Sequence, residues 1–156
     1  MWFLRPGRLR CNFESLIEIV TEETAKLQFP SRIETIAGAT AAVVKEAESF
    51  GFSGEALEAI DLAVREAVTN AVLHGNNQDA GKKVDIVINR NSASFTVAVR
   101  DEGQGFNPAD VPDPTAEQNL LKASGRGMLF MRAFMDEVEW TEHPAGGTIV
   151  RMTKRR

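Results

Sequence analysis

The sequence predicts one α/β domain of two layers, with helices on one face of a mixed, mostly antiparallel sheet. Three observations predict this fold. Two long stretches carry apolar residues at helical spacing, five short segments alternate as strands do, and the elements follow the order β-α-α-β-β-loop-α-β-β. The length of 156 residues fits a single hydrophobic core.

The first strand and helix are predicted by alternation followed by helical periodicity. Residues 24–29 alternate small or apolar with polar side chains, and Pro30 ends the segment. Ser31 and Glu34 have the spacing of a capping box, which predicts a helix start. That helix ends near Gly51. Its predicted buried stripe is Ile33, Ile36, Ala37, Thr40, Val43, Val44, Ala47 and Phe50.

A second helix and a strand pair are predicted next. Ser53 is the expected N-cap of this helix, and Gly75 begins the segment that ends it. Residues 84–88 and 95–99 then alternate as two strands. The expected buried face of the helix is Leu57, Ile60, Val64, Ala67, Val68 and Ala71.

A long polar loop separates these elements from the last part of the chain. Residues 101–126 hold three glycines and three prolines, and a loop of this length usually serves as a lid or a binding loop. One short helix could begin within it, at 115–118. A third helix is predicted over 127–135, followed by strands around 138–140 and 148–152.

Composition excludes several classes of function. The net charge of −4 argues against broad nucleic-acid coating. The single cysteine, Cys11, excludes an intrachain disulfide and a cysteine metal cage. The longest uncharged stretch, 67–78, is too short for a transmembrane helix. The basic start lacks the apolar run of a signal peptide, so a cytoplasmic protein is expected, with 1–21 as an arm of unknown role and 22–156 as the domain.

The second helix carries the first chemically informative motif. Glu66, Asn70 and His74 are spaced i, i+4, i+8 and project along one face. Asn is a poor residue in the middle of a helix, because its amide competes for backbone hydrogen bonds. Taken alone, this motif is equally consistent with a ligand-facing row and with a solvated polar stripe.

Two glycine-containing segments are the other candidates. Residues 101–106, DEGQGF, follow a predicted strand, and their glycines permit a tight turn and close approach of a ligand. An ordinary Asp-Gly hairpin turn is the simpler interpretation of this segment alone. Residues 124–128, SGRGM, open the third helix, where free amides favour an anion. A flexible lid hinge explains that segment equally well.

Together, the three segments resemble the ATPases of the gyrase, heat-shock chaperone, histidine kinase and MutL type. EAVTNAVLHG is similar to the N box of that family, DEGQGF to its first glycine box and SGRGM to its second. Gly147 and Thr148 are similar to its late glycine-threonine element. The resemblance covers about residues 22–153 and implies a Bergerat-type fold with an ATP lid. With FMDEV at 134–138, it is closest to the anti-sigma-factor serine/threonine protein kinases.

The resemblance implies a role for each matching residue. Asn70 would give an oxygen to Mg²⁺, a cation that prefers hard oxygen ligands. Glu66 would act as the general base on a hydroxyl approaching the γ-phosphate of ATP. Asp101 would accept a hydrogen bond from the adenine amino group. The remaining cofactor-binding positions are Gly103 and Gly105 beside base and sugar, Gly125 and Gly127 in the lid, and Thr148 beside the adenine.

Three further polar residues are given weaker roles. His74 is interpreted as part of the site wall and not as a catalytic group. Lys122 and Arg126 lie in the predicted lid, where a cation can neutralise phosphate charge. Solvated lid cations are the alternative for both, and the family pattern carries no role over to Arg126.

The function implied by the resemblance is an anti-sigma factor that is also a protein kinase. It would transfer the γ-phosphate of Mg·ATP to a serine or threonine of a small anti-anti-sigma-type partner, and it would sequester a sigma factor. No direct nucleic-acid or membrane partner is expected, and a homodimer is among the open oligomeric states. The alternative is a non-catalytic ATP-binding module that sequesters a regulator. A sensor histidine kinase is disfavoured, because neither His74 nor His143 lies on a dimerisation helix.

Overall fold

The computed structural model describes residues 22–105 and 126–156. The N-terminal arm, the proposed short helix at 115–118, Lys122 and Gly125 lie outside the described residues.

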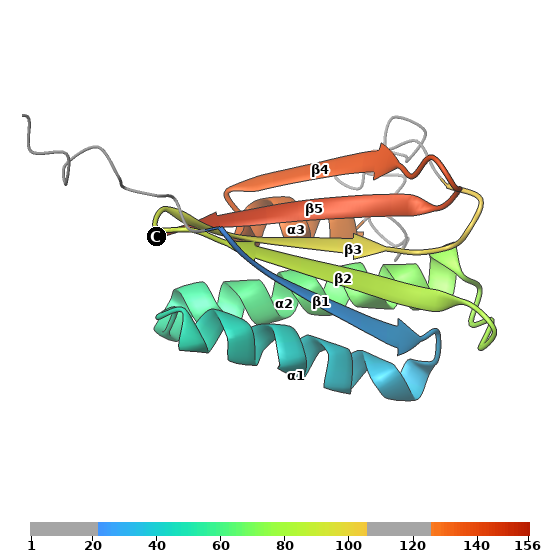
Figure 1. The fold of residues 1–156 in the computed structure, drawn as a ribbon, viewed down its shortest axis with the longest axis horizontal. Helices are drawn as coiled ribbons and strands as arrows, with labels where there is room; N and C mark the ends of the chain where they lie inside the picture. The colour runs from blue at the N-terminus through green and yellow to red at the C-terminus, as the bar shows by residue number, and fades with distance from the viewer. Residues whose placement is uncertain (1–21, 106–125) are drawn as a thin grey trace, which may run out of the picture.

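Five strands form one sheet with the order β1-β2-β3-β5-β4 (Figure 1). All four pairings are antiparallel. The sequence predicts a mixed, mostly antiparallel sheet, and the described strands form no parallel pair. The strands are β1 (Glu23–Pro30), β2 (Lys83–Arg90), β3 (Ser94–Arg100), β4 (Glu137–Glu142) and β5 (Thr148–Arg155).

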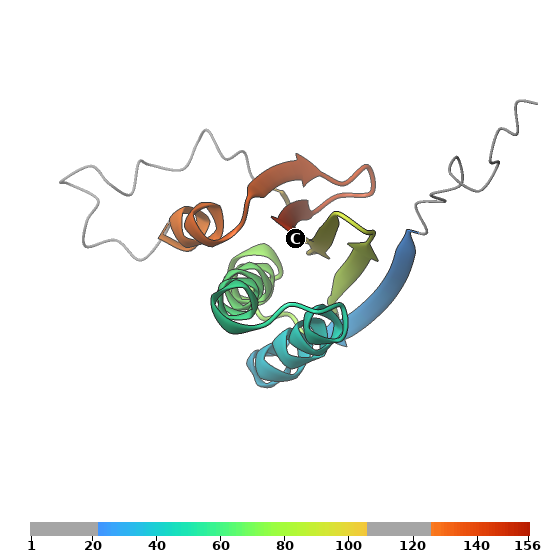
Figure 2. The same cartoon turned by 90° about the vertical axis from the view of Figure 1, so that its left-hand side faces the viewer.

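In the described part of the chain, three α-helices lie on the same face of the sheet (Figure 2). Seen end on, α1 (Ile33–Ser49) lies near β1, α2 (Gly54–Asn70) takes the central place, and α3 (Arg126–Phe134) lies near β4. The helix α2 continues into one turn of π-helix, η2 (Ala71–Gly75). The predicted two-layer sandwich, with helices on one face, is therefore confirmed.

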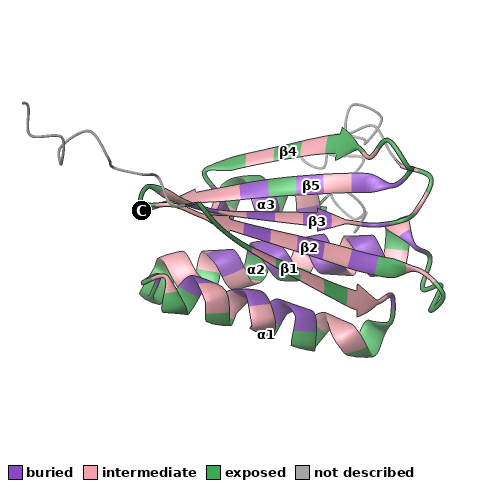
Figure 3. Cartoon of the chain, in the orientation of Figure 1, coloured by how far each residue is buried: buried purple, intermediate pink, exposed green. Residues whose placement is uncertain are grey.

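The core lies between the helices and the inward face of the sheet (Figure 3). Alternate residues of β2 and β3 point into it, as the predicted strand pattern requires. The central helix contributes Ile60, Ala63, Val64, Ala67 and Val68, each at most 1% exposed. Because α2 is anchored along this whole buried stripe, the side chains on its adjoining face are held in fixed positions.

The predicted capping box at the start of α1 is wrong. The N-cap residue is Arg32, and no side chain makes a capping hydrogen bond there. Ser31 lies outside the helix because its backbone amide donates to Lys82 O (3.0 Å), and its buried hydroxyl has no hydrogen-bond partner among the described residues. The Thr35 hydroxyl donates to Pro30 O and Arg32 O instead (2.8 Å each). Ile33, expected in the buried stripe, is 52% exposed.

Among residues 22–105 and 126–156, no helix combines the length and apolar character that crossing a bilayer requires.

Candidate functional site

A pocket of about 570 Å³ lies between α2, α3 and the inward face of the sheet. Its volume falls within the range of roughly 300–1,000 Å³ that is typical of small-molecule sites. Its lining residues are Glu66, Ala67, Thr69, Asn70, Ala71, His74, Gly75, Asn77, Val99, Asp101, Gln104, Gly105, Gly127, Met128, Met131, Trp140, Thr148 and Val150.

One end of the pocket, here called the helix end, is formed by Glu66, Asn70 and Gly127. The first two are half-buried and one turn apart on α2, so both reach the same side of the helix. A Cβ on Gly127, in the first turn of α3, would lie 2.7 Å from Glu66 Oε2 and 3.2 Å from Asn70 Nδ2. Glycine therefore lets the backbone of α3 approach these two polar groups directly.

The π-helical turn η2 carries His74, the third residue of the predicted i, i+4, i+8 motif. His74 still lines the pocket, as the i, i+8 spacing from Glu66 suggested, but its side chain is exposed. The wider turn ends with Asn76 N donating to Ala71 O (2.8 Å). Such turns occur frequently at functional sites, because they redirect the chain within a helix.

The other end, here called the sheet end, is formed by Asp101 and Thr148. Asp101 is buried (7% exposed), and its Oδ1 accepts from Gly103 N (2.9 Å) and Thr148 N (3.2 Å). The backbone amide of Asp101 donates in turn to Thr148 O (3.0 Å). Both backbone amides donate to Oδ1. Oδ2 of Asp101 therefore accepts no hydrogen bond from another described residue.

Glycines allow three chain segments to meet at the sheet end. A Cβ on Gly75 would lie 2.4 Å from Asp101 Oδ2, and one on Gly103 would lie 2.1 Å from Gly75 O. A Cβ on Gly147 would lie only 1.9 Å from Asp101 O. The end of η2, the turn after β3 and the start of β5 can therefore approach each other closely only because these positions lack side chains.

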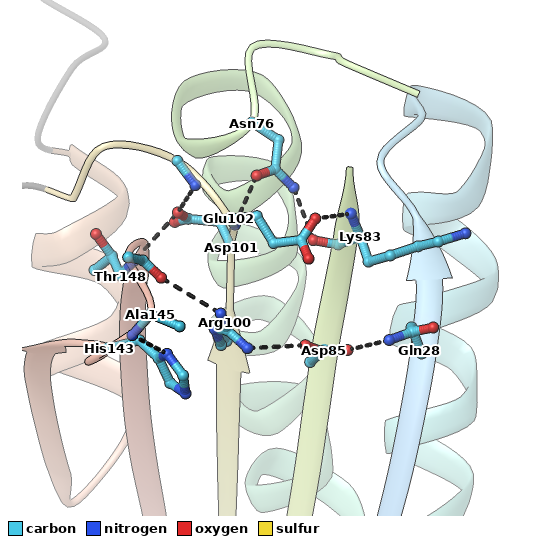
Figure 4. Close-up of polar contacts among 12 residues, drawn as sticks. Gln28, Asn76, Lys83, Asp85, Arg100, Asp101, Glu102, His143, Ala145 and Thr148 are labelled. Atoms are coloured by element: carbon cyan, nitrogen blue, oxygen red, sulfur yellow. Dashed lines mark hydrogen bonds and ion pairs between the residues drawn. The ribbon is translucent and has the colours of Figure 1, made fainter. Parts of the chain in front are cut away.

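A buried asparagine that sequence reasoning passed over holds this arrangement together (Figure 4). Asn76 is 0% exposed; its Nδ2 donates to Lys83 O (2.9 Å), and its Oδ1 accepts from Glu102 N (2.8 Å). Glu102 Oε2 also accepts from Lys83 N (2.7 Å). No local pattern indicates this role for Asn76, because Glu102 lies 26 residues away along the chain.

A second set of contacts ties the hairpin between β4 and β5 to the outer face of the sheet (Figure 4). Arg100 donates to Gly146 O (3.4 Å) and lies 3.5 Å from Asp85 Oδ2. Asp85 also accepts from Gln28 Nε2 (2.7 Å). These contacts cross β1, β2 and β3, and they hold the loop between β4 and β5 that precedes Thr148.

Most of the predicted site residues come together in this pocket. Glu66, Asn70, Asp101, Gly105, Gly127 and Thr148 all line it. Gly103 packs beneath the turn and is not a lining residue, and Arg126 is exposed outside the lining set. Trp140, Met128 and Met131 line the pocket but were not predicted, because an apolar residue on a strand or helix gives no separate signal for a site.

The donor atoms at the helix end fit a hard divalent cation. Carboxylate and amide oxygens are the ligand types that Mg²⁺ prefers, and Mg²⁺ keeps several waters, so few protein ligands are needed. No side-chain hydrogen bond joins Glu66 or Asn70 to another described residue. The described residues therefore leave the side-chain oxygens of Glu66 and Asn70 unbonded.

Residues 29–154 match the family model described as "Histidine kinase-like ATPase domain". The chain belongs to this histidine kinase-like ATPase family. Membership of an ATPase family assigns ATP binding to the domain.

Relatives with a narrower description include proteins named anti-sigma F factor. Those from Bacillus thuringiensis (strain Al Hakam), Bacillus cereus (strain AH187) and Bacillus anthracis (strain A0248) are each 38% identical over 102 residues. Each match covers 64% of this chain and 70% of the relative.

A solved structure shares the fold. It contains the RsbU and RsbW domains of a Mycobacterium tuberculosis protein, and it matches with a TM-score of 0.62 at 20% identity over 85% of this chain. The match spans about a third (32%) of that longer chain, so the likeness concerns the fold alone.

Proposed function

We propose that this protein is an anti-sigma factor with serine/threonine protein kinase activity that uses Mg·ATP. The observation that carries the proposal is one pocket with two chemically different ends: a carboxylate and an amide one turn apart, and a buried carboxylate held by backbone amides. The 38% identity to proteins named anti-sigma F factor supports the regulatory part of the proposal.

In the proposed orientation, the adenine lies at the sheet end. Asp101 Oδ2 would accept from the adenine amino group, since Oδ1 is already engaged by two backbone amides. Thr148 and Gly105 would lie beside the base and sugar. Guanine carries a carbonyl oxygen where adenine carries its amino group, and two acceptors facing each other repel, so this contact would select adenine.

The phosphates then extend toward the helix end. Asn70 would hold Mg²⁺ through its side-chain oxygen, and the bound cation would supply neutralisation of phosphate charge. Gly127, together with Gly125 of the lid, would let backbone amides face the phosphates. Gly125 and Lys122 lie outside the described residues, so their part in the proposal rests on the sequence.

Glu66 is the proposed general base. It would accept the proton of a serine or threonine hydroxyl while the oxygen of that hydroxyl forms a bond to the γ-phosphorus. The bond from that phosphorus to its bridging oxygen breaks, and ADP leaves. Because Glu66 makes no side-chain hydrogen bond to another described residue, its carboxylate is available for this proton.

The proposed partners are a small anti-anti-sigma-type protein, which carries the acceptor hydroxyl, and a sigma factor. Phosphorylation of the first would decide which of the two proteins is held. We further propose that 22–156 acts as the ATPase domain in the cytoplasm, and that a homodimer is the state to test first. The names of the Bacillus relatives support the sigma factor as partner.

The experiment that tests the kinase combines labelled ATP with candidate anti-anti-sigma partners and measures phosphoserine or phosphothreonine. Glu66→Gln should abolish transfer while ATP affinity, measured by calorimetry, stays nearly unchanged. Equal loss of transfer and affinity would contradict the general-base role. Asn70→Ala should instead weaken the Mg²⁺-dependent part of ATP affinity. Tight ATP binding without transfer to any partner would favour a non-catalytic ATP-binding module that sequesters a regulator.

A further inference from the structure

The indole of Trp140 lies in the wall of the pocket at its sheet end. On β4, Val138 and Trp140 are half-buried, whereas Glu137, Glu139 and Thr141 are exposed, so Trp140 belongs to the inward face. It lies opposite Val150 of β5, and both residues line the pocket. The structure therefore places a large aromatic surface in a site where the sequence indicated only polar residues and glycines.

The register relates Trp140 to the pair at the sheet end. Thr148 lies two residues before Val150 on β5 and points to the same face, which makes it the diagonal neighbour of Trp140. Diagonal neighbours in an antiparallel pair lie within reach of an aromatic side chain. Thr148 is bonded to Asp101, so Thr148 links the indole to the carboxylate proposed to recognise adenine, and all three residues line the same pocket.

An arginine from the neighbouring helix lies over one face of the indole. The guanidinium carbon of Arg132 on α3 lies 4.9 Å from the centroid of the Trp140 ring. This distance is within the range of a favourable cation–π contact. The contact joins β4 to α3 and occupies one face of the ring.

We propose that Trp140 is a nucleotide-contacting residue whose indole packs against the base, and that Arg132 is the positioning residue that holds the indole in place. The proposal rests on the proposed orientation of the nucleotide, with its base at Asp101. Every base has an aromatic face, so stacking on an indole adds affinity with little choice among bases. Asp101 would thus select adenine, and Trp140 would strengthen the binding of any purine nucleotide that enters.

The first test uses tryptophan fluorescence. The chain holds two tryptophans, Trp2 and Trp140, so the Trp2→Phe variant leaves Trp140 as the only one. Titration of this variant with Mg·ATP and with Mg·ADP should change its emission, with the same Kd that calorimetry gives. Mg·AMP, which shares the base, should produce the same spectral change at higher concentration.

The second test compares affinities by calorimetry. Trp140→Leu should weaken ATP and GTP binding by a similar factor, about tenfold, whereas Trp140→Phe should keep most of the affinity because it keeps an aromatic face. Phe130→Leu is the matched control, since Phe130 is a 45% exposed aromatic residue of α3 that does not line the pocket.

A third test concerns Arg132. Arg132→Gln should lower the fluorescence anisotropy of Trp140 in the free protein, because the indole becomes more mobile. A general loss of stability would not lower the anisotropy at temperatures far below Tm.

The outcomes separate this proposal from the proposed function. Absence of ATP binding by the wild-type protein would overturn both. ATP binding with no change in Trp140 emission, and with full affinity in Trp140→Leu, would overturn the role of Trp140 alone. A loss of affinity in Trp140→Leu that Trp140→Phe does not recover would point to a structural role and would also overturn it.

Discussion

The two ends of the pocket are built in opposite ways. At the sheet end, Asp101, Thr148 and Asn76 are at most 7% exposed, and each takes part in hydrogen bonds between segments distant along the chain. At the helix end, Glu66 and Asn70 are half-buried and make no side-chain hydrogen bond to another described residue.

This difference agrees with the proposed division between recognition of the base at the sheet end and phosphate chemistry at the helix end. A group that must present one oxygen in one direction has to be fixed by its neighbours, and the buried contacts of Asp101 do this. The roles proposed for Glu66 and Asn70, accepting a proton and binding a metal, require side-chain oxygens that are not already bonded, and no described residue bonds to theirs. Mutations at the sheet end should therefore affect stability and affinity together, except where they preserve its hydrogen bonds, and mutations at the helix end should spare stability.

The largest effect is expected for Gly147→Ala. Its φ is +90°, and a Cβ would lie 1.9 Å from Asp101 O, so the start of β5 and the turn after β3 must move apart. We expect a loss of about 3–5 kcal/mol in the free energy of unfolding, measured by urea denaturation, together with a loss of ATP binding.

Gly146→Ala is the matched control for this change. Gly146 has nearly the same φ, +91°, but the nearest atom to its Cβ would be 3.9 Å away. It should cost only about 1–2 kcal/mol, from backbone strain alone. Equal losses in the two variants would show that conformation, and not the close approach to Asp101, is what requires glycine.

The next effect concerns affinity alone. Asp101→Asn keeps an oxygen for the amides of Gly103 and Thr148 but replaces Oδ2 by an NH₂ group. In the proposed orientation, this group would face the adenine amino group as a second donor. ATP affinity should fall by about 2–3 kcal/mol in calorimetry, while Tm stays close to that of the wild type. A large fall in Tm would mean that the negative charge itself stabilises the sheet end.

A smaller effect, on stability, is expected for Asn76→Ala. This change leaves Lys83 O and Glu102 N without their buried partner, at a cost of about 2 kcal/mol. Urea denaturation measures it, and Gln78→Gly serves as control, because Gln78 is exposed with φ +58° and glycine tolerates that conformation. An unchanged stability would remove Asn76 from the framework of the site.

The smallest effect is expected at the helix end. Glu66→Gln and Asn70→Ala should each leave the free energy of unfolding of the ligand-free protein within about 0.5 kcal/mol of the wild type. Neither side chain makes a hydrogen bond to another described residue, so the substitution breaks none. A loss comparable to that of Asn76→Ala would contradict the division between the two ends.

Local sequence was sufficient for the elements and for most of the pocket. Strand alternation placed the inward faces of β2 and β3, and helical spacing put Glu66 and Asn70 on one face of α2. The capping box failed because Ser31 is bonded to Lys82, a residue 51 positions away that local spacing cannot report. The antiparallel direction of every described pair likewise depends on how distant segments meet.

The sequence by itself thus determined which side chains α2 offers and where glycines permit turns, because both follow from the periodicity and backbone freedom of neighbouring residues. Only the tertiary structure decided that Asn76 joins the start of β2 to the turn after β3, that both backbone amides bonded to the Asp101 carboxylate use Oδ1, and that Trp140 lines the pocket. These features depend on strand order and register, which bring together residues distant along the chain, such as Asp101 and Thr148, 47 positions apart.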